Sequence, residues 1–280
     1  MKKISEILHQ NFLNKKSNYI IDSLENNFIV EGIVIDKYNK TVSLNDSNRG
    51  VDFEGPIYWK DKDNIDMISI FKRTKLDNFN DPYDGNPFIY ALKDIKGWTF
   101  DITDAEIIKY LRKFINNCKK LQQNFDTIII IPSGNDLNRR FMNKLFNLIK
   151  ADFKIEKLIK KISLNVDDIE QFIDYELISK EFPDNHRNIE IQIEDILYEH
   201  QSKNKEFSAK DVDKQLLRYI KFLQINDDPN SIEKINDKNV LVLDDIYSSG
   251  SSIYRAVEAI KQNYNPKSLT GVTLLSKVMK

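Results

Sequence analysis

The chain is poor in the residues that build disulfide frameworks and metal centres. Its 280 residues include one cysteine, Cys118, and three histidines, His9, His186 and His200. A single cysteine excludes an internal disulfide framework and a cysteine-based zinc site. The histidines are scattered along the chain, so they suggest neither a metal cluster nor a catalytic triad.

An excess of charge of one sign and long apolar runs are also missing. The 42 basic residues nearly balance the 43 acidic ones, so the global charge indicates neither nucleic acid nor an anionic membrane as a partner. The apolar runs are far shorter than a bilayer span, and the N-terminus lacks the apolar region of a signal peptide. We therefore expect a soluble, cytoplasmic protein without a membrane partner.

The most informative stretch of the chain is residues 239–252. An apolar run from Val240 to Leu243 ends in two carboxylates, Asp244 and Asp245, and is followed by hydroxyl residues around one glycine and then by apolar residues at helical spacing. This pattern predicts a buried parallel strand, a phosphate-binding loop and a helix. Backbone N–H groups and the positive end of the helix dipole would both point at the anion. The predicted phosphate-binding residues are Ser248, Ser249, Gly250, Ser251 and Ser252.

Two carboxylates directly before a phosphate-binding loop suit a ligand with phosphate at one end and hydroxyls at the other. Ribose 5-phosphate fits, because its vicinal hydroxyls can donate to Asp244 and Asp245 while the loop holds the phosphate. A Walker-B strand also ends in acids, but the chain has no G-x-x-x-x-G-K-[ST] loop. The remaining alternative is a buried strand whose acids merely cap the next helix.

The segment from Val242 to Ser252 resembles the phosphoribosyl-pyrophosphate (PRPP) signature of the type I phosphoribosyltransferases. That signature is an apolar strand, two acids, two variable residues and a Thr/Ser-rich loop around glycine. The resemblance implies an α/β fold with a parallel-sheet core, and transfer of phosphoribosyl from PRPP to a nitrogenous acceptor with release of pyrophosphate. It makes Asp244 and Asp245 the catalytic residues, Mg²⁺ the cofactor and PRPP or a nucleotide the small-molecule partner. The resemblance is also compatible with a homodimer.

A second candidate loop follows the β-branched run Asp126–Ile131. In the resembled family, a loop after an earlier strand holds the pyrophosphate of PRPP. The segment from Pro132 to Asn143 also has a weak similarity to ComF-like phosphoribosyltransferases. The residues predicted for the pyrophosphate loop are Ser133, Gly134 and Asn135. Residues predicted to contact the diphosphate are Arg139, Arg140, Lys161, Lys214 and Arg218, of which the first two are equally compatible with a solvated helix face.

The rest of the chain predicts a β-rich N-terminal region over residues 1–100 and a core over residues 101–280. Strand–helix–strand patterns place both loops at the carboxyl ends of parallel strands, where ligands bind in such sheets. The expected N-terminal elements are a helix at Ile4–Leu13 and β-type runs at Phe28–Ile35, Thr41–Leu44, Ile57–Lys60, Ile68–Arg73 and Phe88–Leu92; the core is expected to begin with a helix at Asp104–Leu121.

The segment 164–238 is too long for a simple crossover between two strands, so we expect it to be a helical insertion. Helices are expected at Val166–Ile173 and Ala209–Leu223. The second would carry a basic stripe, which is either a solvated surface or part of a segment that closes over the diphosphate. The stripe consists of Lys210, Lys214, Arg218 and Lys221. Few residues follow the last predicted strand, so we expect any hood over the acceptor to come from residues 1–100 or 164–238.

A different class of function is also compatible with these motifs. The chain could be a PRPP- or nucleotide-sensing module, without turnover, in a regulatory, DNA-uptake or phage-defence system. The absence of a basic residue within 133–135 favours binding without turnover, whereas the signature itself is neutral between the two hypotheses.

Overall fold

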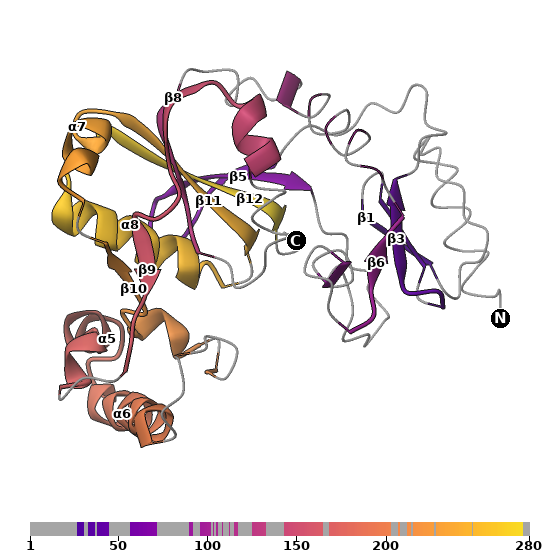
Figure 1. Ribbon diagram of the computed structural model, residues 1–280. Helices are drawn as coiled ribbons and strands as arrows, with labels where there is room; N and C mark the ends of the chain where they lie inside the picture. Colours follow the sequence, from indigo (N-terminus) through magenta and orange to yellow (C-terminus); the bar gives the residue numbers. More distant parts are fainter. Residues whose placement is uncertain are drawn as a thin grey trace.

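The computed structural model is a mixed α/β protein built on a mostly parallel central sheet (Figure 1), which confirms the predicted α/β class. The structure describes residues 27–30, 33–36, 38–44, 57–71, 90–91, 96–101, 125–132, 143–164, 168–202, 212–213, 215–226, 228–247 and 249–276, together with Phe207 and single positions between 103 and 116. No helix in these parts of the chain is long and apolar enough to cross a membrane.

The central sheet has six strands in the order β4-β5-β12-β11-β7-β8, and only β4 runs antiparallel to its neighbour. The strands predicted near 126–131 and 268–275 are confirmed as β7 and β12. The six strands are β4 (Ile57–Lys60), β5 (Asp66–Phe71), β7 (Phe125–Ile130), β8 (Ala151–Ile155), β11 (Asn239–Tyr247) and β12 (Ser268–Ser276).

Strand β11 lies at the centre of the sheet because its apolar run can be buried on both faces. The four side chains from Val240 to Leu243 are fully buried. Helix α8 (Ser251–Asn263) follows and covers one face through an apolar stripe at helical spacing. The stripe consists of Ile253, Ala256, Val257 and Ile260, all buried. The predicted strand–loop–helix unit is therefore confirmed as local structure.

A glycine in β12 lets α8 lie close to the sheet. Gly271 pairs with Val242 of β11 on one side and with Met67 of β5 on the other. A Cβ atom at Gly271 would lie 2.4 Å from the Sδ atom of Met67 and 3.1 Å from the Cγ2 atom of Ile253. Met67 and Ile253 therefore fill the space that a side chain at position 271 would need.

The N-terminal hundred residues contribute to two sheets. The strands β1 (Asn27–Val30), β2 (Ile33–Asp36), β3 (Thr41–Leu44) and β6 (Thr99–Phe100) form a four-stranded sheet. β4 and β5 instead extend the central sheet, so a boundary at residue 100 does not separate the strands of the core. The strand predicted at Phe88–Leu92 is wrong at Tyr90 and Ala91, which are helical.

Two helices are predicted before residue 125, and their outcomes differ. The helix predicted at Ile4–Leu13 lies outside the described residues. Within the helix predicted at Asp104–Leu121, the positions assigned to regular structure are all helical; they are Ala105, Ile108, Arg112, Ile115 and Asn116.

The insertion contains two helices, but not where the sequence predicts them. They are α5 (Tyr175–Glu181) and α6 (His186–Ser202), which lie below the central sheet in Figure 1. The helices expected at Val166–Ile173 and Ala209–Leu223 are wrong. The structure instead has 3₁₀ turns at Glu170–Phe172 and Leu217–Tyr219.

Backbone pairing between distant segments explains the difference. The N–H of Asp174 donates to the carbonyl of Tyr219 at 2.9 Å, and the N–H of Lys221 donates to the carbonyl of Phe172 at 2.7 Å. Adjacent residues such as Tyr219 and Ile220 are both buried, whereas an amphipathic helix buries only one stripe. The chain continues into β10 (Leu223–Ile225), which pairs with β9 (Ile159–Lys161), and into the short helix α7 (Ile232–Ile235) before β11.

The close approach at Gly271 makes a testable prediction. Gly271→Ala should lower the free energy of unfolding by about 1–3 kcal/mol, because the new methyl group overlaps the Met67 side chain. Met67→Val removes the overlapping Sδ and Cε atoms, so the loss in the double variant should be smaller than the sum of the single losses. Urea unfolding of the four proteins measures this coupling, and strictly additive losses would contradict the overlap.

Candidate functional site

The serine loop, residues 248–252, joins the carboxyl end of β11 to the first turn of α8. Gly250 is the N-cap residue of α8, and it supplies no side-chain hydrogen bond to the helix. The Oγ atoms of Ser249 and Ser251 lie 2.9 Å apart, and Ser251 is 2% exposed. The N–H of Ser251 donates to the Oγ atom of Ser249 at 3.5 Å. Because the cap residue has no side chain, no cap side chain occupies the other N–H groups of the first turn of α8, and an anion can accept hydrogen bonds from them.

The conformation of the loop requires glycine at position 250. Gly250 has a φ of 79°, in the left-handed region, and a Cβ atom there would lie 2.7 Å from the Oη atom of Tyr247. The Tyr247 ring in turn packs edge-on against Trp59 of β4, with ring centroids 5.1 Å apart. Burial raises the pKa of the Tyr247 hydroxyl. Tyr247 thus supports the loop from one side as a neutral, packed ring.

The loop lies where the chain connections of the sheet change direction. β7 and β11 are neighbours, but the chain leaves β7 towards β8 and leaves β11 towards β12 on the other side. In open α/β sheets, ligands bind outside the carboxyl ends of the strands at such a switch point. The N–H of Ile131, just after β7, donates to the carbonyl of Leu243 at 2.9 Å, and β11 continues beyond that level to Tyr247. The chain after Pro132 and the serine loop therefore both start at the carboxyl end of the sheet, and the serine loop starts further out than the end of β7.

The two acidic residues of the signature point to opposite faces of the sheet. β11 continues to Tyr247 with regular pairing to β12, so successive side chains alternate between the faces. The side chain of Asp244 lies on the face covered by α8, like that of Val242 two residues earlier on β11. The side chain of Asp245 lies on the opposite face. The Oδ1 atom of Asp244 accepts the N–H of Asp245 at 2.8 Å, and both residues are half-buried. Asp244 is thus the acid on the same face as the helix that follows the loop.

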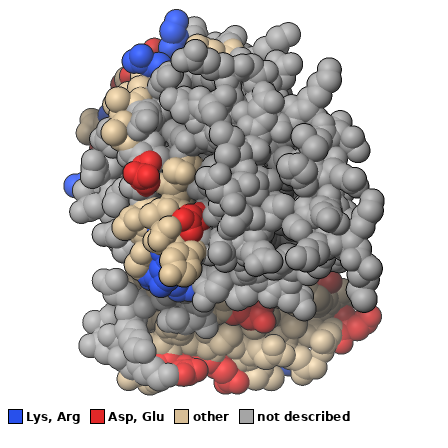
Figure 2. Space-filling view, turned by 90° about the vertical axis from the view of Figure 1, so that its right-hand side faces the viewer, with Lys and Arg blue, Asp and Glu red and all other residues tan. Residues whose placement is uncertain are grey.

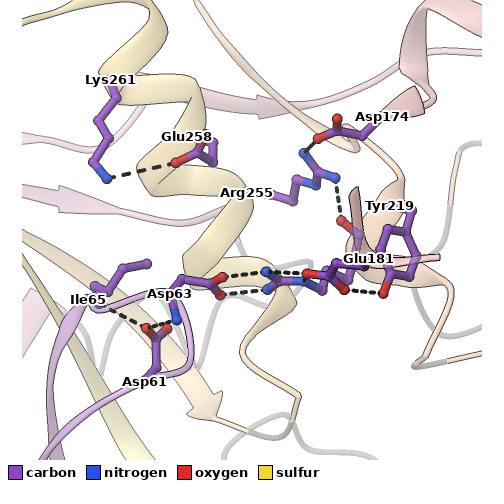
Figure 3. Close-up of polar contacts among 10 residues, drawn as sticks. Asp61, Asp63, Ile65, Asp174, Glu181, Tyr219, Arg255, Glu258 and Lys261 are labelled. Carbon is purple, nitrogen blue, oxygen red and sulfur yellow. Dashed lines mark hydrogen bonds and ion pairs between the residues drawn. The ribbon is translucent and has the colours of Figure 1, made fainter. Parts of the chain in front are cut away.

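Beside α8 lies a buried cation, Arg218. It is 5% exposed and binds the carboxylate of Asp63 with two nitrogens, one of them at 2.6 Å. It also donates to Glu181 at 3.2 and 3.3 Å, and its guanidinium lies 4.1 Å from the ring centroid of Tyr254. We call these four residues the Arg218 clamp; Figure 3 shows its two carboxylates, those of Asp63 and Glu181. The prediction that Arg218 belongs to an exposed basic helix stripe is wrong.

The electrostatics of the clamp favour charged partners. Burial acts to lower the pKa of Arg218, but the hydrogen bond and charge of Asp63, with Glu181, outweigh it and raise that pKa. Burial, together with the hydrogen bond to Glu181 at 2.5 Å, also raises the pKa of Tyr219. Arg218 therefore stays charged and engaged, and its guanidinium faces protein carboxylates.

A second buried arginine ties α8 to the insertion. Arg255 is 3% exposed, donates to Asp174 at 2.6 Å and also to the carbonyl oxygen of Arg218. Asp174 is at the same time the N-cap of α5, where its side chain accepts the N–H of Leu177 at 3.1 Å. The first two turns of the helix after the serine loop are thus connected to α5 by charge-assisted hydrogen bonds.

The turn between β4 and β5 presents Asp63 to the clamp. Asp61 is 9% exposed, and its Oδ1 atom accepts the N–H groups of Asp63 and Ile65, each at 2.9 Å (Figure 3). Burial raises the pKa of the Asp61 carboxyl, although these two hydrogen bonds and Arg218 act in the opposite direction. Three segments that are distant in the sequence therefore converge beside α8.

The structure brings together only some of the residues predicted from the sequence. Ser249, Gly250, Ser251 and Ser252 lie around the start of α8, at the end of the strand that carries Asp244 and Asp245. Lys161 is exposed on β9, in the small two-stranded sheet with β10. Predicted residues that lie outside the described part of the chain are Ser133, Gly134, Asn135, Arg139, Arg140, Lys214 and Ser248.

The helices of the insertion are acidic. Residues 168–202 contain ten acidic and only two basic residues. Figure 2 shows acidic side chains along the lower edge of the molecule, at the height of α5 and α6 in Figure 1. Among the described residues no group of three or more His, Cys, Asp or Glu side chains is arranged to hold a metal ion. This surface would repel rather than attract a free diphosphate.

A cavity of about 530 Å³ lies at the other end of the sheet. It is lined by residues including Phe125 and Ala151, the first residues of β7 and β8. Ligand sites in parallel sheets lie at the carboxyl ends of the strands, so we do not assign this cavity to the site around the serine loop.

Sequence reasoning missed Asp63, Glu181, Tyr254 and Arg255. The only available signals were an Asp-rich turn at 61–64 and an arginine inside the apolar pattern of α8. No protein-family model matches the chain, and a comparison with curated proteins finds no match. The description of the site therefore depends on its geometry.

The clamp should be an important source of stability. Arg218→Met should lower the free energy of unfolding by about 1–3 kcal/mol, because it removes the cation that the half-buried carboxylate of Asp63 and the more exposed one of Glu181 bind. Arg218→Lys should also destabilise, since lysine cannot bind Asp63 with two nitrogens. Lys261→Met is the control: its pair with Glu258, at 3.8 Å, is solvent-exposed and worth less than about 1 kcal/mol. Equal denaturation midpoints for Arg218→Met and Lys261→Met would refute this role.

Proposed function

We propose that this protein binds PRPP, or a related ribose 5-phosphate ligand, and transfers the phosphoribosyl group to a nitrogenous acceptor with release of pyrophosphate. One observation carries this: a glycine-capped helix N-terminus follows a carboxylate-bearing central strand at the switch point of a parallel sheet. The helix start suits a 5-phosphate, and the carboxylate of Asp244 suits the ribose hydroxyls. The likeness of residues 242–252 to the phosphoribosyltransferase signature supports the same reading.

The side chains at the end of β11 suit the chemistry of this transfer. Breaking the anomeric bond of PRPP leaves positive charge on the ribose ring, which a nearby carboxylate stabilises. Asp244, with one oxygen already oriented by the N–H of Asp245, is the residue we assign to this role. The serine loop would hold the 5-phosphate and so fix the ring relative to that carboxylate.

Magnesium would be held mainly by the ligand. The described residues contain no cluster of protein ligands for a metal, but Asp244 and Asp245 offer hard oxygen donors at the strand end. Such a donor set fits Mg²⁺, which commonly binds to one or two carboxylates together with substrate phosphates and water. When bound, Mg²⁺ would neutralise the leaving pyrophosphate.

The second candidate is a sensor that binds PRPP or a nucleotide without turnover. Two observations favour it: Arg218, a predicted diphosphate contact, is bound to Asp63 and Glu181, and the insertion helices are acidic. Both reduce the positive charge available to a leaving pyrophosphate. Exchange of labelled pyrophosphate into PRPP, measured with a panel of nitrogenous bases, separates an enzyme from a sensor.

Binding at the serine loop can be tested by substituting two glycines, one in the loop and one elsewhere. Gly250→Ala should weaken PRPP binding at least about tenfold in calorimetry, because it combines backbone strain with overlap on Tyr247. Gly97→Ala is the matched control: Gly97 has a φ of 73°, but a Cβ atom there would lie 3.9 Å from the nearest atoms, which belong to the Lys40 side chain. It should leave the affinity unchanged. Equal affinities in the Gly250→Ala and wild-type proteins would remove the loop from the site.

The two acids should differ in their effect on turnover. Asp244→Asn removes the charge on the α8 face at nearly constant size, so turnover should fall on the order of 10²-fold while PRPP affinity falls less. Asp245→Asn should have the smaller effect, since its side chain points to the other face. Steady-state kinetics of both variants measures this difference, and wild-type turnover in Asp244→Asn would refute the catalytic role.

A further inference from the structure

A row of three polar side chains crosses the central sheet just before the strands reach the ligand end. Asp244 of β11 pairs with Thr273 of β12, and Thr273 pairs with Ser69 of β5. Ser69 and Thr273 are both fully buried. Residues paired in register on neighbouring parallel strands point to the same face, so these three side chains lie side by side.

The face they share is the one covered by α8. A side chain at Gly271 would contact Ile253 of α8, and Thr273 is two residues further along the same strand. Neighbouring strands are about 4.8 Å apart, which places the Thr273 hydroxyl within side-chain reach of the Asp244 carboxylate. The row thus runs from Ser69 on β5, next to the edge strand β4, to Asp244 on β11, the acid that we assign to the ribose.

Among the described residues, the buried hydroxyl of Thr273 lacks a partner, as does that of Ser276 at the end of the same strand, but only Thr273 pairs with Asp244. Within the described structure, the Oγ1 atom of Thr273 makes no hydrogen bond. Thr127 of β7 is equally buried, but its hydroxyl donates to the carbonyl of Lys234. An unpaired buried hydroxyl lowers stability, and valine has nearly the same shape without that cost. Folding alone therefore favours valine over threonine at position 273.

We propose that Thr273 is a positioning residue for Asp244, and this role depends on the proposed binding of a ribose 5-phosphate. When the ribose hydroxyls donate to Asp244, the Thr273 hydroxyl donates to the same carboxylate from the neighbouring strand. The N–H of Asp245 already holds the Oδ1 atom at 2.8 Å, so a second donor fixes the plane of the carboxylate. The hydroxyl that is unpaired without ligand is satisfied in the complex.

Removing the hydroxyl at position 273 should therefore weaken ligand binding without lowering stability. Thr273→Val should unfold at the same temperature as the wild type or up to about 2 °C higher, yet bind ribose 5-phosphate about tenfold more weakly. Its affinity for inorganic phosphate should not change, because phosphate contacts only the serine loop. Thr273→Ser keeps the hydroxyl and should retain the affinity for ribose 5-phosphate. Calorimetry and thermal unfolding of the whole protein measure these values.

A matched control removes a hydroxyl that already has a partner. Thr127→Val should lower the unfolding temperature and leave the ribose 5-phosphate affinity unchanged. If wild type and Thr273→Val bind ribose 5-phosphate equally, Thr273 has no positioning role, while the proposed function stands. If Thr273→Val loses affinity for ribose 5-phosphate and phosphate alike, the effect is a general disturbance and the role is overturned. If the wild type binds neither PRPP nor ribose 5-phosphate, the proposed function fails, and this role with it.

Discussion

The buried charge of Arg218 is the constraint on which the arrangement around the serine loop depends. Removing a guanidinium from water costs several kcal/mol unless carboxylates and hydrogen bonds replace the solvent. Asp63 supplies a two-nitrogen pairing across 155 positions of sequence, Glu181 a further carboxylate and Tyr254 a ring face. Because each partner comes from a different segment, a shift of any one of them would leave the buried guanidinium with fewer favourable contacts. The β4–β5 turn, the insertion and α8 are therefore held in one mutual arrangement.

This arrangement supports the N-terminal end of α8, where we propose that the 5-phosphate binds. Tyr254 is in the first turn of the helix, and Arg255 is anchored to Asp174 of the insertion. On the other side, Tyr247 packs between Gly250 and Trp59 of β4. A binding loop is most effective when its surroundings already hold it in the bound conformation, since less ordering is then needed when the ligand arrives. The insertion thus has a structural role at the site even though its helices are acidic.

The candidate site divides into a local part and a distant part. Asp244, Gly250 and Ser251 are close in sequence, so strand periodicity followed by a glycine-hydroxyl loop was enough to predict them as a unit. Asp63, Glu181 and Thr273 reach the same region through other strands and helices, and no spacing within the sequence relates them. Arg218 was noticed as a cation but placed on an exposed helix, because its neighbours also fit a helical pattern. Burial changes its role from a surface charge to an internal ion-pair centre.

The features that could be predicted from the sequence are those that depend on neighbouring residues: the buried strand β11, the helix α8 that begins after a glycine, the parallel αβ pattern and the strands at 41–44 and 57–60. Contacts between distant segments determine that β4 and β5 join the central sheet, that residues 219–223 pair with distant segments instead of continuing an α-helix, and that Thr273 lies beside Asp244. The reason is physical. Periodicity and turn chemistry act within a few residues, whereas strand partners and buried ion pairs are chosen by which distant surfaces can exclude water together.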